Sequence, residues 1–157
     1  MKVKHLMTKD PTCCVASDTA QRAAAIMRDE NVGIVPVIEN EQSRRLVGVV
    51  TDRDLCMNVV AEGRDPSAVA VEACMTTKVV SCAPGDAVAK ATELMKDNQV
   101  RRVPVVDEHG ALAGIVAMAD LVERAELKVT ETHETLKRVS TPSEVPSKPR
   151  ARSRAVA

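Results

Sequence analysis

The chain has 157 residues, of which 45% are hydrophobic and 28% charged, and this fits one compact globular protein or two small halves that share a core. Its 22 lysine and arginine residues balance 22 aspartate and glutamate residues, so the formal net charge is zero. No overall field would gather nucleic acid or an anionic membrane, and neither partner is expected.

The first half of the chain predicts a helix, two strands and a second helix. Ser17-Asp18 is a helix-start signal, and alanines follow it at helical spacing. Short apolar strands are predicted over Val32–Ile38 and Leu46–Thr51, and the next helix is predicted to begin near Asp52.

The second half of the chain repeats the first. Met-Thr at position 7 recurs at position 75, and Val-Pro-Val at position 35 recurs at position 103, a shift of 68 residues in both cases. The repeat predicts a helix from Gly85-Asp86, strands over Val100–Val106 and Leu112–Ala117, and a helix from Met118. Two copies indicate a duplicated unit that packs against itself rather than a solenoid.

Beyond about Lys128 the apolar periodicity disappears, and prolines, serines and basic residues dominate. The predicted organisation is a first domain over residues 1–66, a second over 67–130 and a disordered basic tail over 131–157. A solubilising role for this tail is favoured over contact with nucleic-acid phosphates.

The sequence from Gly48 to Asp54 has two interpretations. In the first, Thr51 is a helix N-cap and Asp54, three residues on, completes a capping box. In the second, the Thr51 hydroxyl donates to a phosphate and the Asp54 carboxylate accepts from the hydroxyls of a ribose. Residue chemistry alone favours the cap, because such boxes are common.

The combined pattern favours a ligand site. Met-Thr, a helix, a strand with Val-Pro-Val and then Gly-x-x-Thr-x-x-Asp, repeated in a second copy that has Ala117 in place of the threonine, resembles the tandem CBS-domain pair, or Bateman module, over residues 3–127. The resemblance implies an α/β (α+β) fold in which two β-α-β-β-α units pack as a pseudo-twofold pair with two clefts between them. It also implies a regulator that commonly binds AMP, ADP or ATP, or sometimes NAD or S-adenosylmethionine, and that often forms a homodimer.

The resemblance also implies roles for single residues. Asp54 would hold the ribose, Thr51 a phosphate, and Arg101 and Arg102 further phosphates. Successive strand residues point to opposite faces, so both arginines reach one cavity only if the strand end is irregular; otherwise they are a solvated strand start.

The adenine at the Asp54 site would lie between the strand Ile34–Val37 and the segment Thr12–Cys13, with Val80–Ser81 and Arg102–Val105 as their counterparts in the second copy. The expected ligand-binding residues are Thr12, Cys13, Ile34, Val35, Pro36, Val37, Thr51, Arg53, Asp54, Val80, Ser81, Arg101, Arg102, Val103, Pro104, Met118 and Asp120.

The second copy departs from the pattern at Ala117, where a serine or threonine is expected. Asp120 is still placed to hold a ribose, but the phosphate hydroxyl is lost, and one net hydrogen bond is worth about 1 kcal/mol. We therefore expect unequal sites. The Asp54 site is expected to be the better one, and the second to be empty, weak or suited to a less phosphorylated adenosine.

Other classes of function are not expected. The five cysteines include no Cys-x-x-Cys pair, which predicts buried reduced thiols in a cytoplasmic protein rather than a zinc site or disulfides. No nucleophile, base pair or metal cluster points to an enzyme. The sequence thus predicts a nucleotide sensor that acts on an unknown effector protein. The alternative is a structural protein for dimerisation or partner docking that has no physiological nucleotide.

Overall fold

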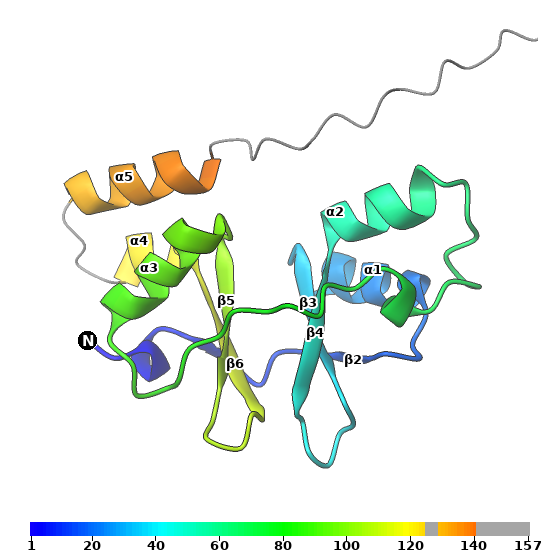
Figure 1. Cartoon of the computed structure of the whole chain (residues 1–157), viewed down its shortest axis with the longest axis horizontal. Coiled ribbons are helices and arrows are strands. Elements are labelled where there is room, and N and C mark those ends of the chain that lie inside the picture. Colours follow the sequence, from blue (N-terminus) through cyan, green and yellow to red (C-terminus); the bar gives the residue numbers. More distant parts are fainter. Residues whose placement is uncertain (125–128, 141–157) are drawn as a thin grey trace, which may run out of the picture.

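The structure, a computed structural model, describes residues 1–124 and 129–140. It consists of two units that lie side by side, each with one small sheet and helices packed on it (Figure 1). The predicted mixed fold of two units is confirmed, and so are the predicted helices and strands of each copy.

The first unit holds a sheet of order β2-β3-β4, in which β2 is parallel and β4 antiparallel to β3. Its helix α2 continues directly into the π-helix η2. The elements are β2 (Cys14–Val15), α1 (Ala20–Asp29), β3 (Ile34–Ile38), β4 (Leu46–Thr51), α2 (Asp52–Leu55), η2 (Cys56–Val60) and the 3-10 helix η3 (Val71–Ala73).

The second unit holds a sheet of order β1-β6-β5, in which both neighbouring pairs are antiparallel. The elements are the 3-10 helix η1 (Val3–His5), β1 (Thr8–Lys9), α3 (Val88–Asn98), β5 (Arg102–Val106), β6 (Leu112–Ala117), α4 (Met118–Arg124) and α5 (Val129–Ser140).

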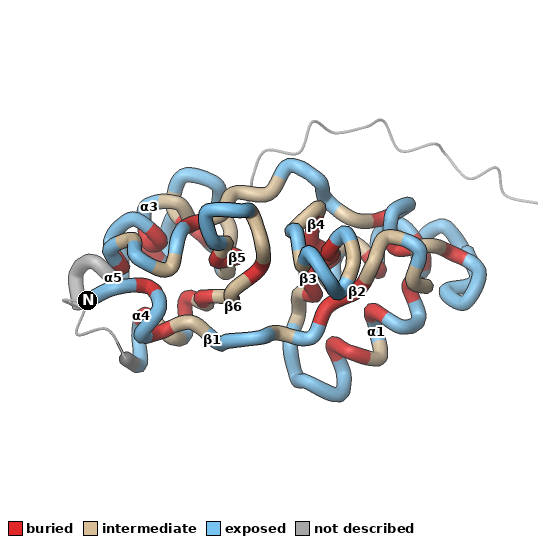
Figure 2. The backbone as a smooth tube through the Cα atoms, turned by 90° about the horizontal axis from the view of Figure 1, so that it is seen from below, coloured by how far each residue is buried: buried red, intermediate tan, exposed pale blue. Residues whose placement is uncertain are grey.

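Each unit has its own aliphatic core between its sheet and its helices, and the buried residues gather there (Figure 2). Val35 and Val37 of β3 are fully buried in the first core, and Val103 and Val105 of β5 are fully buried in the second. Because side chains alternate along a strand, the residues between these valines face away from the cores. That alternation leaves one face of β3 and of β5 to line the space between the units.

The two units exchange the segments that precede them in sequence. The Val3 amide donates to the Asp86 carbonyl at 3.0 Å, and β1 pairs with β6, so residues 2–9 belong spatially to the second unit. Reciprocally, the Val71 amide donates to the Asp18 carbonyl at 2.7 Å, and residues near 70–76 pair with the first unit. The domain boundary at residue 66 stays a prediction that rests on the repeat in the sequence. In space, the chain crosses between the units twice, because each leading segment packs on the other unit.

Helix α5 corrects the expectation of disorder from residue 131. It packs against α3, where Thr135 and Val139, four residues apart, are buried on one helix face. Arg138 Nη2 also lies 4.0 Å from Asp97 Oδ1 of α3. The rest of the predicted tail, residues 141–157, lies outside the described residues.

None of the helices in the described ranges combines the length and the hydropathy that a membrane span needs.

Candidate functional site

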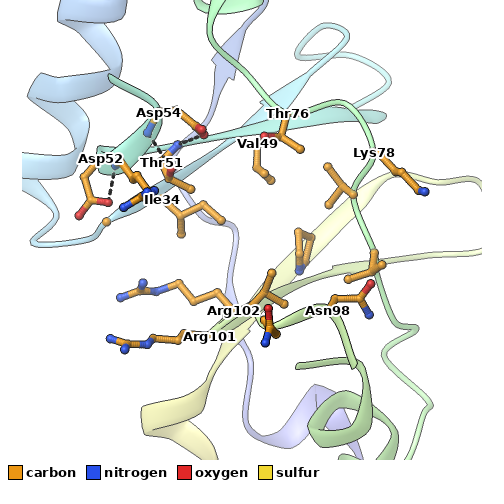
Figure 3. A pocket seen from close by; sticks show the side chains of 17 residues that line it. Ile34, Val49, Thr51, Asp52, Asp54, Thr76, Lys78, Asn98, Arg101 and Arg102 are labelled. Atoms are coloured by element: carbon orange, nitrogen blue, oxygen red, sulfur yellow. Dashed lines mark hydrogen bonds between the residues drawn. The ribbon is translucent and has the colours of Figure 1, made fainter. Parts of the chain in front are cut away.

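Two cavities lie between the units. The larger of these two measures about 770 Å³, within the range that is usual for small-molecule sites (Figure 3). The first unit contributes Thr51 and Asp54, where β4 runs into α2. The second unit contributes Arg101 and Arg102 at the start of β5. The cavity therefore brings together polar side chains that are far apart in the sequence.

Thr51 and Asp54 form the capping box that the sequence predicted. Thr51 Oγ1 accepts a hydrogen bond from the Asp54 amide at 3.1 Å, and Asp54 Oδ2 accepts one from the Thr51 amide at 2.9 Å. Among the described residues, nothing else donates to the Asp54 carboxylate. Capping therefore leaves the Thr51 hydroxyl proton and one Asp54 oxygen for a ligand, so the two interpretations are compatible.

Four cationic side chains line this cavity against two carboxylates, those of Asp52 and Asp54. The cations are Arg53, Lys78, Arg101 and Arg102. Within the described part of the chain, none of the four forms an ion pair. Unpaired cations that converge on one cavity favour an anionic ligand.

Arg101 and Arg102 both line the cavity although they are neighbours in the sequence. Arg101 directly precedes β5, and its carbonyl accepts a hydrogen bond from the Met118 amide at 2.8 Å. Figure 3 shows the two guanidinium groups pointing the same way. Both arginines therefore line one cavity, as the resemblance implied.

The aliphatic walls correct part of the predicted list. Ile34 and Pro104 line the larger cavity, and Pro36 lines a smaller one. Every second residue of the two strands points into a core instead, and Cys13 and Met118 are also buried. The predicted residues that line neither cavity for this reason are Cys13, Val35, Val37, Val103 and Met118.

The smaller cavity, about 210 Å³, is the counterpart of the larger one in the second copy. It holds Asp120 and Ala117 together with Thr12, which the sequence had assigned to the Asp54 site. Val80 occupies the matching place beside Thr51 in the larger cavity. The exchange of segments between the units causes this correction, because each segment meets the helix start of the other copy.

Ser81 lies in a separate hollow of about 200 Å³ with Gly110 and lines neither main cavity. Sequence reasoning did not find Lys78 and Asn98 of the larger cavity or Glu30 of the smaller one. The repeat carried a signal for the last two, because Asn98 and Glu30 are matching positions at the ends of α3 and α1.

Four of the five cysteines are buried and pack inside the protein. Burial raises the pKa of Cys14 and of Cys82 to about 11, so both are neutral thiols at physiological pH. Cys56 is exposed, contrary to the expectation that all five are buried. In residues 1–124 and 129–140 no three His, Cys, Asp or Glu side chains come together as a metal site would require.

Comparison with known proteins agrees with this geometry. The family model for the CBS domain matches residues 3–61 and 71–126, which is most of the chain and both repeats. The chain belongs to the CBS-domain family. It is 40% identical over 119 residues to the CBS domain-containing protein YhcV of Bacillus subtilis, covering 76% of this chain and 81% of that protein.

Two solved structures show the same arrangement. Hypoxic Response Protein I with two coordinated zinc ions has a TM-score of 0.72 and 30% identity, covering 79% of this chain and 98% of its own. The CBS domain pair of protein MJ0100, in complex with 5′-methylthioadenosine and S-adenosyl-L-methionine, has a TM-score of 0.69 and 25% identity. The match covers 78% of this chain and 93% of that one.

Proposed function

We propose that this CBS pair is a regulatory module that binds an adenine nucleotide in the larger cavity. The observation that carries the proposal is the convergence on one cavity of four cations that have no ion-pair partner among the described residues, together with the capping-box carboxylate of Asp54. An adenine nucleotide combines an anionic phosphate chain with a ribose diol and an apolar base, and the cavity offers a matching group for each part.

The ribose is assigned to Asp54. The carboxylate is fixed by its bond from the Thr51 amide, and its second oxygen is left to accept from a ribose hydroxyl. The phosphates are assigned to Arg101, Arg102 and Lys78, with the Thr51 hydroxyl as a further donor.

The base is assigned to the aliphatic wall. The protein has no aromatic residue, so adenine cannot stack on an aromatic face. Ile34, Val80 and Pro104 line the cavity and offer apolar surface on which a flat ring would lie. The related pair of MJ0100 was solved with two adenosine ligands, which supports an adenosine at such a site.

Regulation would follow from the position of the ligand between the units. A ligand that contacts both units stabilises the mutual arrangement that fits it best, and it shifts the population by its differential affinity. The change would pass to an effector protein. We propose no catalytic step, because the groups in the cavity are assigned to binding.

The decisive experiment is isothermal titration calorimetry with AMP, ADP, ATP, NAD and S-adenosylmethionine. Intrinsic fluorescence is silent, because the chain has no Trp or Tyr. Binding to the parent that is lost in Asp54→Ala but retained in Asp120→Ala establishes the site and ranks the ligands. Asp54→Asn keeps an acceptor for the Thr51 amide and controls for loss of the cap. No binding of any of the five ligands by the folded parent contradicts the proposal.

A second candidate function is self-association without a physiological nucleotide. It is favoured by Met57 and Val60, which are 52% and 72% exposed on η2 and offer apolar surface to a second copy. Sedimentation velocity of the parent and of Val60→Glu tests it. A dimer that dissociates in the variant supports this interface, and a parent that is monomeric at all concentrations contradicts it.

A further inference from the structure

The hollow of about 200 Å³ that holds Ser81 is separate from the two cavities between the units. It is lined by the first residues of β4, by the chain segment 77–81 that crosses between the units, and by the hairpin that joins β5 to β6. Within the described part of the chain, no group donates to the Val79 carbonyl and no hydrogen bond engages the Ser81 hydroxyl. The hollow thus offers two oxygen acceptors that the chain itself does not use.

The hairpins of the two copies meet symmetrically beside this hollow. The Leu46 amide donates to the Gly110 carbonyl at 3.1 Å, and the Leu112 amide donates to the Arg44 carbonyl at 2.9 Å. Gly110 and Arg44 are therefore equivalent positions, and both have a positive φ, of 79° and 47°. Such a φ is uncommon for an arginine, and the two copies differ here by a complete side chain.

The side chain of Arg44 occupies the place in the first copy that corresponds to the hollow. Its Nη2 donates to the Pro11 carbonyl at 3.4 Å and lies 3.7 Å from Cys13 Sγ, and its Nε is buried. Pro11 and Cys13 match Val79 and Ser81, the residues that supply the two open acceptors. The hollow is thus the space that an arginine side chain fills in the other copy, and it stays open where glycine stands instead.

The chemistry of the hollow suits a guanidinium group. The Ser81 hydroxyl oxygen is a better acceptor than the thiol that stands at the matching position. The turn that bears Gly110 also carries Asp107 and Glu108, as a carboxylate oxygen of Glu41 lies 3.7 Å from Nη1 of Arg44. A hollow of this size holds one side chain, because sites for whole small molecules are usually larger.

We propose that the hollow is a docking site for an arginine side chain of a partner protein, which takes the place that Arg44 takes in the other copy. The guanidinium donates to the Val79 carbonyl and the Ser81 hydroxyl, and its methylene stem lies against Leu46 and Val106. Among the described residues, no charged side chain lines the hollow, so nothing there would hold the α-amino and α-carboxylate groups of free arginine. The inference goes beyond nucleotide binding and does not depend on it.

The first experiment uses N-acetyl-arginine amide, in which both ends are blocked as in a polypeptide. Nitrogen–proton correlation NMR of the parent, without nucleotide, should show saturable shifts of the amides of Val79, Ser81 and Gly110. The blocked lysine analogue keeps the charge but lacks the planar fork, and the blocked citrulline analogue keeps the shape but lacks the charge. Each should bind at least about fivefold more weakly, the equivalent of one net hydrogen bond.

Gly110→Arg should fill the hollow from within the chain and abolish binding of the blocked arginine. Nothing lies within 4 Å of a Cβ built at this position, and Arg44 shows that an arginine adopts a positive φ at the equivalent place. Gly63→Arg is the matched control, because Gly63 also has a positive φ and an open surrounding but does not line the hollow. It should bind the probe as the parent does, and circular dichroism should show that both variants are folded.

The converse variant, Arg44→Gly, should open a second hollow and add shifts of the Thr12 and Cys13 amides when the blocked arginine is added. The inference is wrong if the parent shows no shifts at the hollow, if the lysine analogue binds equally well, or if Gly110→Arg binds as the parent does. Tighter binding of unblocked arginine would assign the site to a free metabolite and contradict a protein partner. A dimeric parent that dissociates in Gly110→Arg would make a second copy the occupant and would contradict it as well.

Discussion

Ile34 and Arg102 occupy the same place in the two copies, and each of them lines both cavities. Ile34 pairs with Thr51 across the first sheet, and Arg102 pairs with Ala117 across the second. In the wall that the two cavities share, the first copy thus contributes the apolar Ile34 and the second copy contributes the cationic Arg102. Arg102 is the one residue of the pair that can bind a phosphate.

Replacing this arginine by the residue of the other copy, Arg102→Ile, should weaken ATP binding about tenfold or more, since a hydrogen bond to a charged group contributes about 1.5–3 kcal/mol. Adenosine, which has no phosphate, should lose little affinity. Calorimetry with both ligands measures the difference. Arg28→Ile alters an exposed arginine that lines neither cavity and serves as the control. Equal losses for ATP and adenosine would show that Arg102 acts on the fold instead.

The two helix caps offer an exchange experiment. Thr51→Ala removes the hydroxyl that accepts from the Asp54 amide and should lower the free energy of unfolding by about 1 kcal/mol. Ala117→Thr should complete the half-formed box of the second copy and raise stability by a similar amount. At this chain length each change corresponds to a shift of about 2–4 °C in Tm, measurable by circular dichroism. An Ala117→Thr variant that melts below the parent would contradict the equivalence of the two caps.

Gly114 lies where an exchanged segment passes close to a sheet. A Cβ at this position would lie 2.6 Å from the Thr8 carbonyl oxygen and 2.9 Å from Met7 Sδ, and the backbone oxygen cannot move without disturbing β1. Gly114→Ala should therefore destabilise the protein by about 1–3 kcal/mol. Urea unfolding followed by circular dichroism measures this.

Gly85 provides the control for that substitution, because nothing lies within 4 Å of a Cβ built there. Gly85→Ala should change stability by no more than about 0.5 kcal/mol. If both variants lose the same stability, the contact with β1 is not the cause.

The sequence predicted those parts of the site that depend on neighbours along the chain. The capping box needs only Thr51 and Asp54 three residues apart, so its pattern is visible in the sequence. The helices and strands were predictable for the same reason: their hydrophobic periodicity is a local property of the sequence, and it occurs in both copies.

The assignment of segments to cavities was not predictable. Thr12 and Val80 hold the same place in the two copies, and only the crossing of the chain decides that Val80 lies with Asp54 and Thr12 with Asp120. An alignment of the two copies is the same whether each leading segment packs on its own copy or on the other one, so the repeat gives no information on the exchange. Lys78 was missed for this reason, since it lies on the crossing segment.

Thiol chemistry gives a prediction about pH. The raised pKa values of Cys14 and Cys82, about 11, mean that iodoacetamide at pH 8 should label Cys56 first and the buried thiols only on unfolding. Above about pH 9 the unfolded thiols ionise while the folded ones stay protonated, so the free energy of unfolding should fall as the pH rises. Mass spectrometry of the labelled protein and urea titrations at several pH values check the two parts. Rapid labelling of Cys14 or Cys82 in the folded protein would contradict their burial.

The exchange of segments can be tested through Val3 and Val71, which match in the two copies and are both fully buried, each in the core of the other copy. Either valine replaced by alanine should cost about 1–3 kcal/mol. Hydrogen exchange read by mass spectrometry should show the local consequence, because packing contacts set the protection of nearby amides. Val3→Ala should increase exchange in α3 of the second unit, although Val3 lies in the first copy of the sequence, and Val71→Ala should do so in α1. The opposite assignment would mean that each copy packs its own leading segment, and the pairing of Thr12 with Asp120 would fall with it.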